Sequence, residues 1–435
     1  SDGTPRTGTH PRSAFNPVRS YHPDEYVIFK SLSGMNPGRL EFFHGFFGWP
    51  AAQFYVVGAA LKAASGLGLV RLVPDMNFYY RNPEEMARLY VVGRVVTLLF
   101  AVGTLIVLWR AGTCLFGVAG GAAAAVLLAV TPLFVVNAHY MTADIPMLFW
   151  IALVLLGATR ILRGGGWKAY LLCGVALGLA AGTRYQGALA ACLIVAAHLA
   201  RPLQEAAGEA KRGILRRRAP ALLLSRELWL AGAVSLGVFL LTNPYVLPRF
   251  PQFAREFAGE FSGSHGALGL FHWTALAATT GLGIVFALAS VASLWLLAVR
   301  PAREGLFVLI GLGLPALLLW LTKPAMARYM IPALLLPALL VGYAFALFDG
   351  AAAGISRRAE EAARAADTAP ARAHARSRRR ARWAPVLLLA AVVLATGLQS
   401  WAFAALYSDP AKDTRARAAE AIAANVPAGE TIGIV

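Results

Sequence analysis

The sequence predicts an all-α polytopic membrane protein, a bundle of about ten or eleven transmembrane helices with an acidic loop on its outer face. The first observation is the composition, since 58% of the 435 residues are hydrophobic and only 14% are charged, whereas a soluble domain carries about 25% charged residues. The second is that many apolar stretches approach the roughly 20 residues that cross a bilayer. The third is that basic residues cluster in short loops between these stretches, as the positive-inside rule predicts.

Ten apolar stretches are the clearest candidates for transmembrane helices. They cover residues 89–109, 117–137, 142–162, 168–183, 185–200, 227–247, 274–299, 305–322, 328–349 and 384–404. Residues 49–70 are also apolar, but they contain Lys62, glycine and aromatic residues. Two interpretations of this segment stay open: a further span, or an amphipathic helix at the membrane surface.

The lysines and arginines predict the orientation. They gather in five connections, near residue 110 and at 160–168, 201–226, 300–303 and 354–383, which we place in the cytoplasm. If residues 49–70 do not cross, the outer side of the plasma membrane receives residues 1–88, 138–141, 182–185, 243–273, 323–327 and the C-terminal tail. The net charge of +18 is then a set of topology signals, which argues against nucleic-acid binding.

This orientation divides the chain into five parts. They are an outer loop with an acidic motif and interfacial helices (1–88), a transmembrane catalytic core (89–349), a basic cytoplasmic loop (350–383), a last transmembrane helix (384–404), and the start of an outer soluble segment (405–435). Because the chain begins at Ser1 and ends in a strand-like stretch at Val435, we expect truncation at both ends. The three cysteines lack paired spacing, so we expect small buried side chains and no disulfide framework or zinc site.

Asp144 is the only acidic residue within residues 86–204. It lies at the start of an apolar stretch, where an unpaired charge is costly and is rarely kept without a use. Asp144 or Thr142 is alternatively a cap for the helix that follows. Arg94 lies just inside a span near the outer face and needs a partner, for which Asp144 is a candidate. Two further polar residues precede Asp144 by about one turn, His139 and Tyr140.

A second acidic motif, His22-Pro-Asp-Glu25, precedes the first apolar stretch. Pro23 favours an extended residue before it, so both acids lie near the start of the next helix. One interpretation is that Asp24 caps this helix. The other is that one of the two acids is a general base, while its neighbour orients it or binds a cation.

Several cations and polar residues share the predicted outer face. Arg184, between small residues, suits contact with a phosphate or carboxylate, although snorkelling to lipid headgroups also explains it. Lys323 and Arg328 precede a span and suit a leaving phosphate, and a headgroup anchor is an equal alternative. The other candidate substrate contacts are Tyr185, Asn243, Tyr245 and Tyr329. Simple helix termination is the stronger explanation of Asn243-Pro-Tyr245.

No glycine-rich nucleotide motif or nucleophile elbow is present, so an enzyme of this kind takes its donor from the membrane. In the order and spacing of its motifs the chain resembles the GT-C superfamily of polytopic glycosyltransferases. It is most similar to the branch of the dolichyl-phosphate-mannose protein mannosyltransferases and the bacterial aminoarabinose transferases. The motifs that carry the resemblance are His22–Glu25, Val92–Arg94, Phe116–Gly117, Leu127–Pro132, His139–Pro146, Gly178–Gly187, Asn243–Tyr245 and Lys323–Pro332.

The resemblance implies transfer of a hexosyl or pentosyl group from a polyprenyl-phosphate sugar to a protein, lipid or glycan acceptor on the outer face. Asp24 matches the catalytic base, and Asp144 matches a second acidic position. Arg184, Lys323 and Arg328 match the cations that hold the lipid phosphate. A single displacement inverts the anomeric carbon. A divalent metal is a possible cofactor, but the sequence shows no ligand set.

Two other classes of function remain open. A transporter or lipid flippase also carries intramembrane charges and broken helices. The chain shows no clear internal repeat, and its acids lie at one membrane face, which favours the enzyme. A scaffold without catalytic activity predicts that Asp24→Asn and Asp144→Asn keep function.

Overall fold

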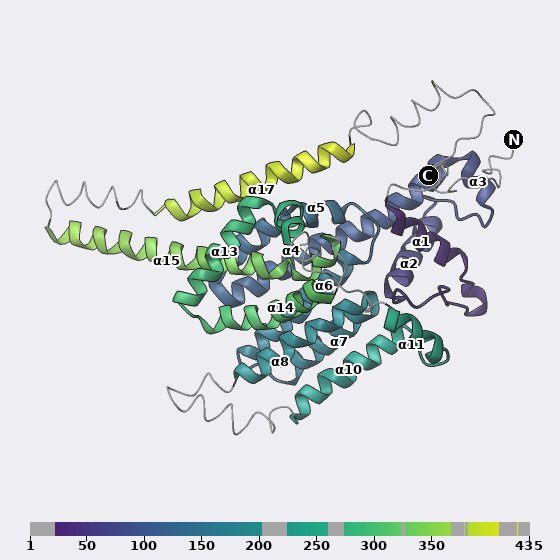
Figure 1. Ribbon diagram of the computed structural model, residues 1–435, viewed down its shortest axis with the longest axis horizontal. Helices are drawn as coiled ribbons and strands as arrows, with labels where there is room; N and C mark the ends of the chain where they lie inside the picture. The colour runs from purple at the N-terminus through teal and green to yellow at the C-terminus, as the bar shows by residue number, and fades with distance from the viewer. Residues whose placement is uncertain are drawn as a thin grey trace.

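The computed structural model describes residues 22–201, 224–259, 274–322, 327–366, 378, 382–408 and 424, and it shows a bundle of helices (Figure 1). Within these residues the structure has no strand, and a single antiparallel bridge joins Asn36 to Glu41. The all-α fold class is therefore confirmed.

The bundle begins with α4 (Pro83–Ala129), which turns back on itself at Gly117. Gly117 has a φ of 82°, a conformation that side-chain-bearing residues rarely adopt. The two arms then pack closely, since a Cβ atom on Gly112 would lie 2.8 Å from the Cα atom of Gly121. The arms correspond to the predicted spans 89–109 and 117–137, except that the second ends at Ala129 and the short α5 (Pro132–Ala138) follows.

Helix α6 (Asp144–Leu162) lies at the centre of the bundle, and most of its residues are buried. It packs against α4, α7 (Trp167–Thr183) and α8 (Ala191–Ala200). Helix α8 follows the 3₁₀ turn η2 (Tyr185–Ala190), so the junction at Arg184 is a break in the helix. Helices α14 (Arg303–Thr322) and α15 (Leu335–Ala366) complete the core, and α17 (Ala384–Ser408) lies outside it.

Two predicted spans are interrupted by short irregular turns. The first consists of the π-helical turn η4 (Ala277–Leu282) and α13 (Ile284–Val299), bent by 113° at Gly283. The second starts as the 3₁₀ turn η5 (Ala327–Ala333) before α15 begins at Leu335. Within the described residues five helices are long and apolar enough to cross a membrane, or six with the bent pair. The count of ten or eleven spans stays a prediction.

The prediction of a loop that begins at residue 350 is wrong for the first part of that segment, because it is helical. Helix α15 continues to Ala366 and projects beyond one end of the bundle (Figure 1). Alanine favours helix, and opposite charges four residues apart, Arg357 with Glu361 and Glu360 with Arg364, add support. Residues 409–423 and 425–435, most of the predicted outer segment, lie outside the described residues.

Short helices form a layer at the opposite end of the bundle: α1 (Pro23–Ser33), α2 (Ala52–Gly66), α3 (Met76–Arg81) and α11 (Phe250–Gly259) (Figure 1). Helix α2 has 15 residues and is not among the candidate spans, which favours the surface interpretation of residues 49–70. An apolar cluster that includes Ile28, Phe54, Val57, Leu89 and Met141 packs this layer against α4.

Helix α10 (Arg226–Thr242) packs along α7 on the side of the bundle. Three glycines of α7, spaced four residues apart, lie at the contact: Gly174, Gly178 and Gly182. A Cβ atom on Gly178 would lie 2.5 Å from the Ser235 carbonyl oxygen, which shows how closely the backbones approach. This small-residue spacing is typical of packed membrane helices.

We predict that Gly178→Ala destabilises the protein by about 1 to 3 kcal/mol, the usual cost of overpacking. The control is Gly237→Ala on α10, where an added Cβ atom has nothing within 4 Å and alanine favours the helix. Thermal unfolding of the purified protein in detergent measures both. Equal melting temperatures for the two variants would contradict close packing at Gly178.

Candidate active site

The first acidic motif lies at the start of α1. His22 has an extended backbone before Pro23, and its Nδ1 atom accepts a hydrogen bond from the Asp24 amide at 3.3 Å. His22 is therefore the helix cap, and the expectation that Asp24 caps the helix is wrong. Because His22 provides the cap, the Asp24 carboxylate can make other contacts. Asp24 and Glu25 are both buried.

Asp24 and Asp144 meet at one buried cluster with two arginines. Arg184 lies 3.0 Å (Nε) and 3.3 Å (Nη2) from the two carboxylate oxygens of Asp144. Its Nη2 atom is also 3.8 Å from Oδ2 of Asp24. Arg328 donates a hydrogen bond to the same Asp24 oxygen. Asp24 and Arg328 are 304 positions apart in sequence. They thus belong to one network of two carboxylates and two guanidinium groups.

The backbone explains why these side chains converge. Asp144 is the first residue of α6, and Arg184 is the extended residue that ends α7. Arg328 belongs to η5, the 3₁₀ turn before α15. Asp144 is 1% exposed and Arg184 is 5% exposed, and charges at this depth are tolerated only when they are paired.

Glu25 belongs to a separate ion pair. Its two carboxylate oxygens accept hydrogen bonds from Nε and Nη2 of Arg94 at 2.9 and 2.8 Å. Oε1 also accepts the backbone amide of Met141 at 2.8 Å. The expected Arg94–Asp144 pair is therefore wrong, because α1 supplies a nearer carboxylate. The pair fastens α1 to α4 and to the turn before Asp144.

Tyr140 and His139 lie in that same turn. The Tyr140 ring is 4.9 Å from the His22 ring and 5.8 Å from the Arg94 guanidinium. Tyr140 thus contacts both the residue that caps α1 and the arginine that pairs with Glu25. His139 is exposed and donates from Nδ1 to the Val135 carbonyl at 2.5 Å, which agrees with a surface role and places it away from the cluster.

Three other residues that were predicted to contact the substrate instead hold residues 40–51, which we call the aromatic loop. The Tyr245 hydroxyl accepts the Phe42 amide at 2.9 Å, and Asn243 Oδ1 accepts the Ala51 amide at 2.7 Å. The Tyr185 hydroxyl donates to the Phe47 carbonyl at 2.6 Å. In this structure these residues support a loop. Tyr329 is half-buried beside Arg328, and Lys323 lies outside the described residues.

Sequence reasoning missed Trp49 and assigned Thr142 only a capping role. The Trp49 ring lies 5.4 Å from the Arg184 guanidinium, on the aromatic loop. The Thr142 hydroxyl is buried beside the acidic turn and has no hydrogen-bond partner within the described part of the chain. Four phenylalanines and a tryptophan within residues 42–49 were a signal for the first. The capping alternative for Asp144 or Thr142 is wrong, because Ala143 is the N-cap residue of α6 and no side chain caps the helix.

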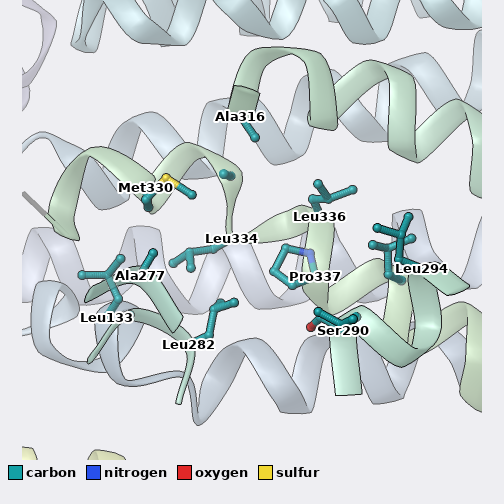
Figure 2. Close-up of a pocket in the computed structure, with 14 residues that line it drawn as sticks. Leu133, Ala277, Leu282, Ser290, Leu294, Ala316, Met330, Leu334, Leu336 and Pro337 are labelled. Carbon is teal, nitrogen blue, oxygen red and sulfur yellow. The ribbon is translucent and has the colours of Figure 1, made fainter. Parts of the chain in front are cut away.

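An apolar cavity of about 230 Å³ lies between the interrupted helices (Figure 2). Met330, two residues after Arg328, lies in its wall with Leu334 of the same turn region. Leu282 and Leu294 line it from both sides of the bend at Gly283, and Leu133 from α5. The interrupted helices therefore line a hydrophobic space, and the turn η5 contributes Met330 to that space and Arg328 to the charged cluster.

The cluster does not fit a divalent cation. No group of three His, Cys, Asp or Glu side chains among the described residues is placed to hold a metal ion. Both carboxylates of the cluster already face guanidinium groups, so the cluster as a whole is electrically neutral.

We predict that Glu25→Gln lowers the free energy of unfolding by about 2 to 3 kcal/mol, since it leaves Arg94 without its counterion. The value is below that of a fully enclosed pair, because the Arg94 side chain is 36% exposed. The control is Glu84→Gln, an exposed acid in the first turn of α4. Thermal unfolding in detergent compares them, and a wild-type melting temperature for Glu25→Gln would count against the pair.

We also predict loss of stability at acidic pH through His44. Its Nε2–H group donates to the Trp49 carbonyl at 2.8 Å, and its Nδ1 atom is buried without a partner in the described structure. Burial lowers the pKa of His44, although the hydrogen bond to Trp49 and the charge of Glu256 oppose this shift. The unfolded chain therefore takes up the proton first, so the stability is complete above pH ~6.5 and falls as the pH drops below it.

Melting temperatures at pH 8 and pH 5.5 measure this effect. We expect the difference between them to shrink in His44→Phe, which keeps the stacking on Phe54 (ring centroids 4.7 Å apart) but cannot be protonated. His139→Gln removes an exposed imidazole from the same end of the bundle and should keep the wild-type difference. An unchanged difference in His44→Phe would exclude His44 as the acid-sensitive group.

Comparison with known proteins gives a family-model match over the part of the chain that carries three of the site residues. Residues 89–240, which include Arg94, Asp144 and Arg184, match the model of the dolichyl-phosphate-mannose-protein mannosyltransferase family. A comparison with curated protein sequences finds no match.

Three solved structures share the fold. The crystal structure of ArnT from Cupriavidus metallidurans bound to undecaprenyl phosphate aligns with a TM-score of 0.57 and 17% identity, over 89% of this chain and 72% of ArnT. The apo state of the same protein gives a TM-score of 0.52 and 16% identity, over 90% and 73% of the two chains. The Archaeoglobus fulgidus oligosaccharyltransferase in the apo form gives 0.50 and 12% identity, over 89% of this chain and 53% of that chain. The chain thus has the fold of the GT-C glycosyltransferases, and its predicted resemblance to the protein mannosyltransferases and ArnT is confirmed.

Proposed function

We propose that the protein transfers a sugar from a polyprenyl-phosphate donor to an acceptor on the outer face of the plasma membrane. The observation that carries this proposal is the buried cluster of Asp24, Asp144, Arg184 and Arg328. The turn η5, which supplies Arg328, also supplies Met330 to the wall of an apolar cavity. A lipid-linked phosphate needs cations for its headgroup and an apolar space for its chain. The matching family model names a dolichyl-phosphate donor, and the ArnT structure contains undecaprenyl phosphate.

Asp24 is the proposed general base. It accepts the proton of the acceptor hydroxyl or amine while that atom attacks the anomeric carbon opposite the departing phosphate. Because Arg328 and Arg184 hold Asp24 in the free protein, an incoming phosphate competes for the same guanidinium groups. In the proposed reaction the phosphate takes over Arg328, and the Asp24 carboxylate turns to the acceptor. A single displacement of this kind inverts the sugar.

Asp144 has a positioning role in this proposal. It holds Arg184 through both carboxylate oxygens, so the guanidinium group remains oriented when the phosphate arrives. Preorganised charges aimed at the growing negative charge are usually the largest contribution to catalysis. Arg184 and Arg328 supply these charges, and we keep Lys323 as a third candidate. The sugar, hexosyl or pentosyl, and the acceptor, protein, lipid or glycan, are left to experiment.

One observation favours a transporter or lipid flippase instead. The helix pair η4 and α13 is bent by 113° next to the apolar cavity, and broken helices also occur in transport proteins. The charged cluster favours the enzyme, because a base next to phosphate-binding cations has no part in moving a lipid. Lipid movement without a glycosylated product in proteoliposomes would support the transporter.

We predict that Asp24→Asn lowers the transfer rate by about 10²- to 10⁴-fold, the contribution typical of a general base, while the protein stays folded. The assay uses protein in liposomes with a panel of polyprenyl-phosphate sugars and detects the product by mass spectrometry. The control is Glu41→Gln, which removes an exposed acid from the same end of the bundle and should keep the wild-type rate. A wild-type rate for Asp24→Asn would rule out Asp24 as the base.

A further inference from the structure

The aromatic loop, residues 40–51, is fixed from outside by side chains distant in sequence. Glu256 Oε2 accepts the Phe47 amide at 2.5 Å. Asn243 Oδ1 accepts the Ala51 amide at 2.7 Å, and the Tyr185 hydroxyl donates to the Phe47 carbonyl at 2.6 Å. The loop therefore holds its shape through side-chain bonds to its backbone, because no regular secondary structure covers residues 42–51.

Among these anchors Glu256 is the one that comes from α11. Its second carboxylate oxygen accepts Nε2 of Gln252, one turn earlier on the same helix, at 2.8 Å. The adjacent aromatic face of α11 packs on the same place, with Phe253 5.8 Å from the Phe47 ring and Phe257 4.9 Å from the Tyr185 ring. A hydrogen bond to a carboxylate is stronger than one to a neutral acceptor, so Glu256 is the firmest link between α11 and the loop.

The aromatic loop places the Trp49 ring against Arg184. The guanidinium lies 5.4 Å from the Trp49 ring, within the range of a cation–π contact. On its other side Arg184 faces Asp144 and Asp24. The direction of the Arg184 fork is therefore set between an aromatic ring and two carboxylates, and the position of the ring depends on the loop anchors.

We propose that Glu256 is a positioning residue for glycosyl transfer, which holds Phe47 and thereby sets Trp49 and Arg184. This proposal rests on the proposed function. Arg184 interacts most strongly with the phosphate as its charge grows, so a small displacement weakens the transition state more than the bound donor. Loss of such an interaction lowers kcat more than it raises the KM for the donor.

The experiment compares three variants in the liposome transfer assay. Glu256→Leu removes the acceptor for the Phe47 amide, and we expect kcat to fall about tenfold while the donor KM changes less than about threefold. Glu256→Gln retains an oxygen for that amide and should stay within about threefold of the wild-type kcat. Arg255→Gln is the matched control, since Arg255 is the exposed neighbour on the same helix, and it should behave as wild type.

A double-mutant cycle separates positioning from a general loss of structure. Trp49→Leu leaves every loop anchor in place and should lower kcat about tenfold on its own. If Glu256 acts through Trp49, the double variant is no slower than Trp49→Leu alone. Losses that multiply in the double variant, or a wild-type kcat in either single variant, overturn the proposal.

The same assay distinguishes this failure from failure of the proposed function. If the wild-type protein forms no glycosylated product, the proposed function itself is wrong. If the wild type is active and Glu256→Leu matches it in kcat, only the positioning role is wrong. Should Glu256→Leu not fold, Glu256→Ala replaces it in the same cycle, with the same expected and contradicting outcomes.

Discussion

The site depends on one buried cation, Arg184, and on the need to pair it. Removing a charged group from water costs several kcal/mol unless nearby opposite charges compensate. Arg184 is compensated by Asp144 on α6 and Asp24 on α1, and Arg328 on η5 shares Asp24. None of these elements supplies the network alone. The pairing therefore requires α1, α6, the end of α7 and η5 to come together, and the site exists only in the assembled bundle.

Helix α1 satisfies this requirement because its two neighbouring acids point to different partners. Successive residues of an α-helix differ by about 100° in direction, so Asp24 reaches the arginines of the cluster while Glu25 reaches Arg94 and the Met141 amide. His22 closes the start of the helix and leaves both carboxylates available. One short helix is thus attached to α4, to the turn before α6 and to the charged cluster.

The sequence predicted the parts of this arrangement that depend on the chain alone. Helix-forming apolar stretches, the rarity of Asp144 and its position at the edge of an apolar stretch are all local properties. The prediction that Asp144 pairs with Arg94 was wrong, because Glu25 and Asp144 are equally reasonable partners until the placement of α1 is known. Trp49 was missed for a similar reason: an aromatic residue near the membrane usually serves as an anchor, and only the loop bonds from Asn243 and Glu256 bring it to Arg184.

The neutrality of the cluster has a consequence for the proposed reaction. A polyprenyl-phosphate sugar is a phosphodiester with one negative charge, whereas the released polyprenyl phosphate is a monoester that gains a second charge as the bond to the sugar breaks. Two guanidinium groups therefore interact more strongly with the leaving group than with the donor. Interactions of this kind accelerate a reaction, because they are greater in the transition state than in the bound substrate. Asp144, which keeps Arg184 oriented, also limits the attraction to the product, since it holds part of the charge of Arg184 before and after the transfer. A cluster with the two arginines alone would bind the released phosphate more tightly and slow its departure.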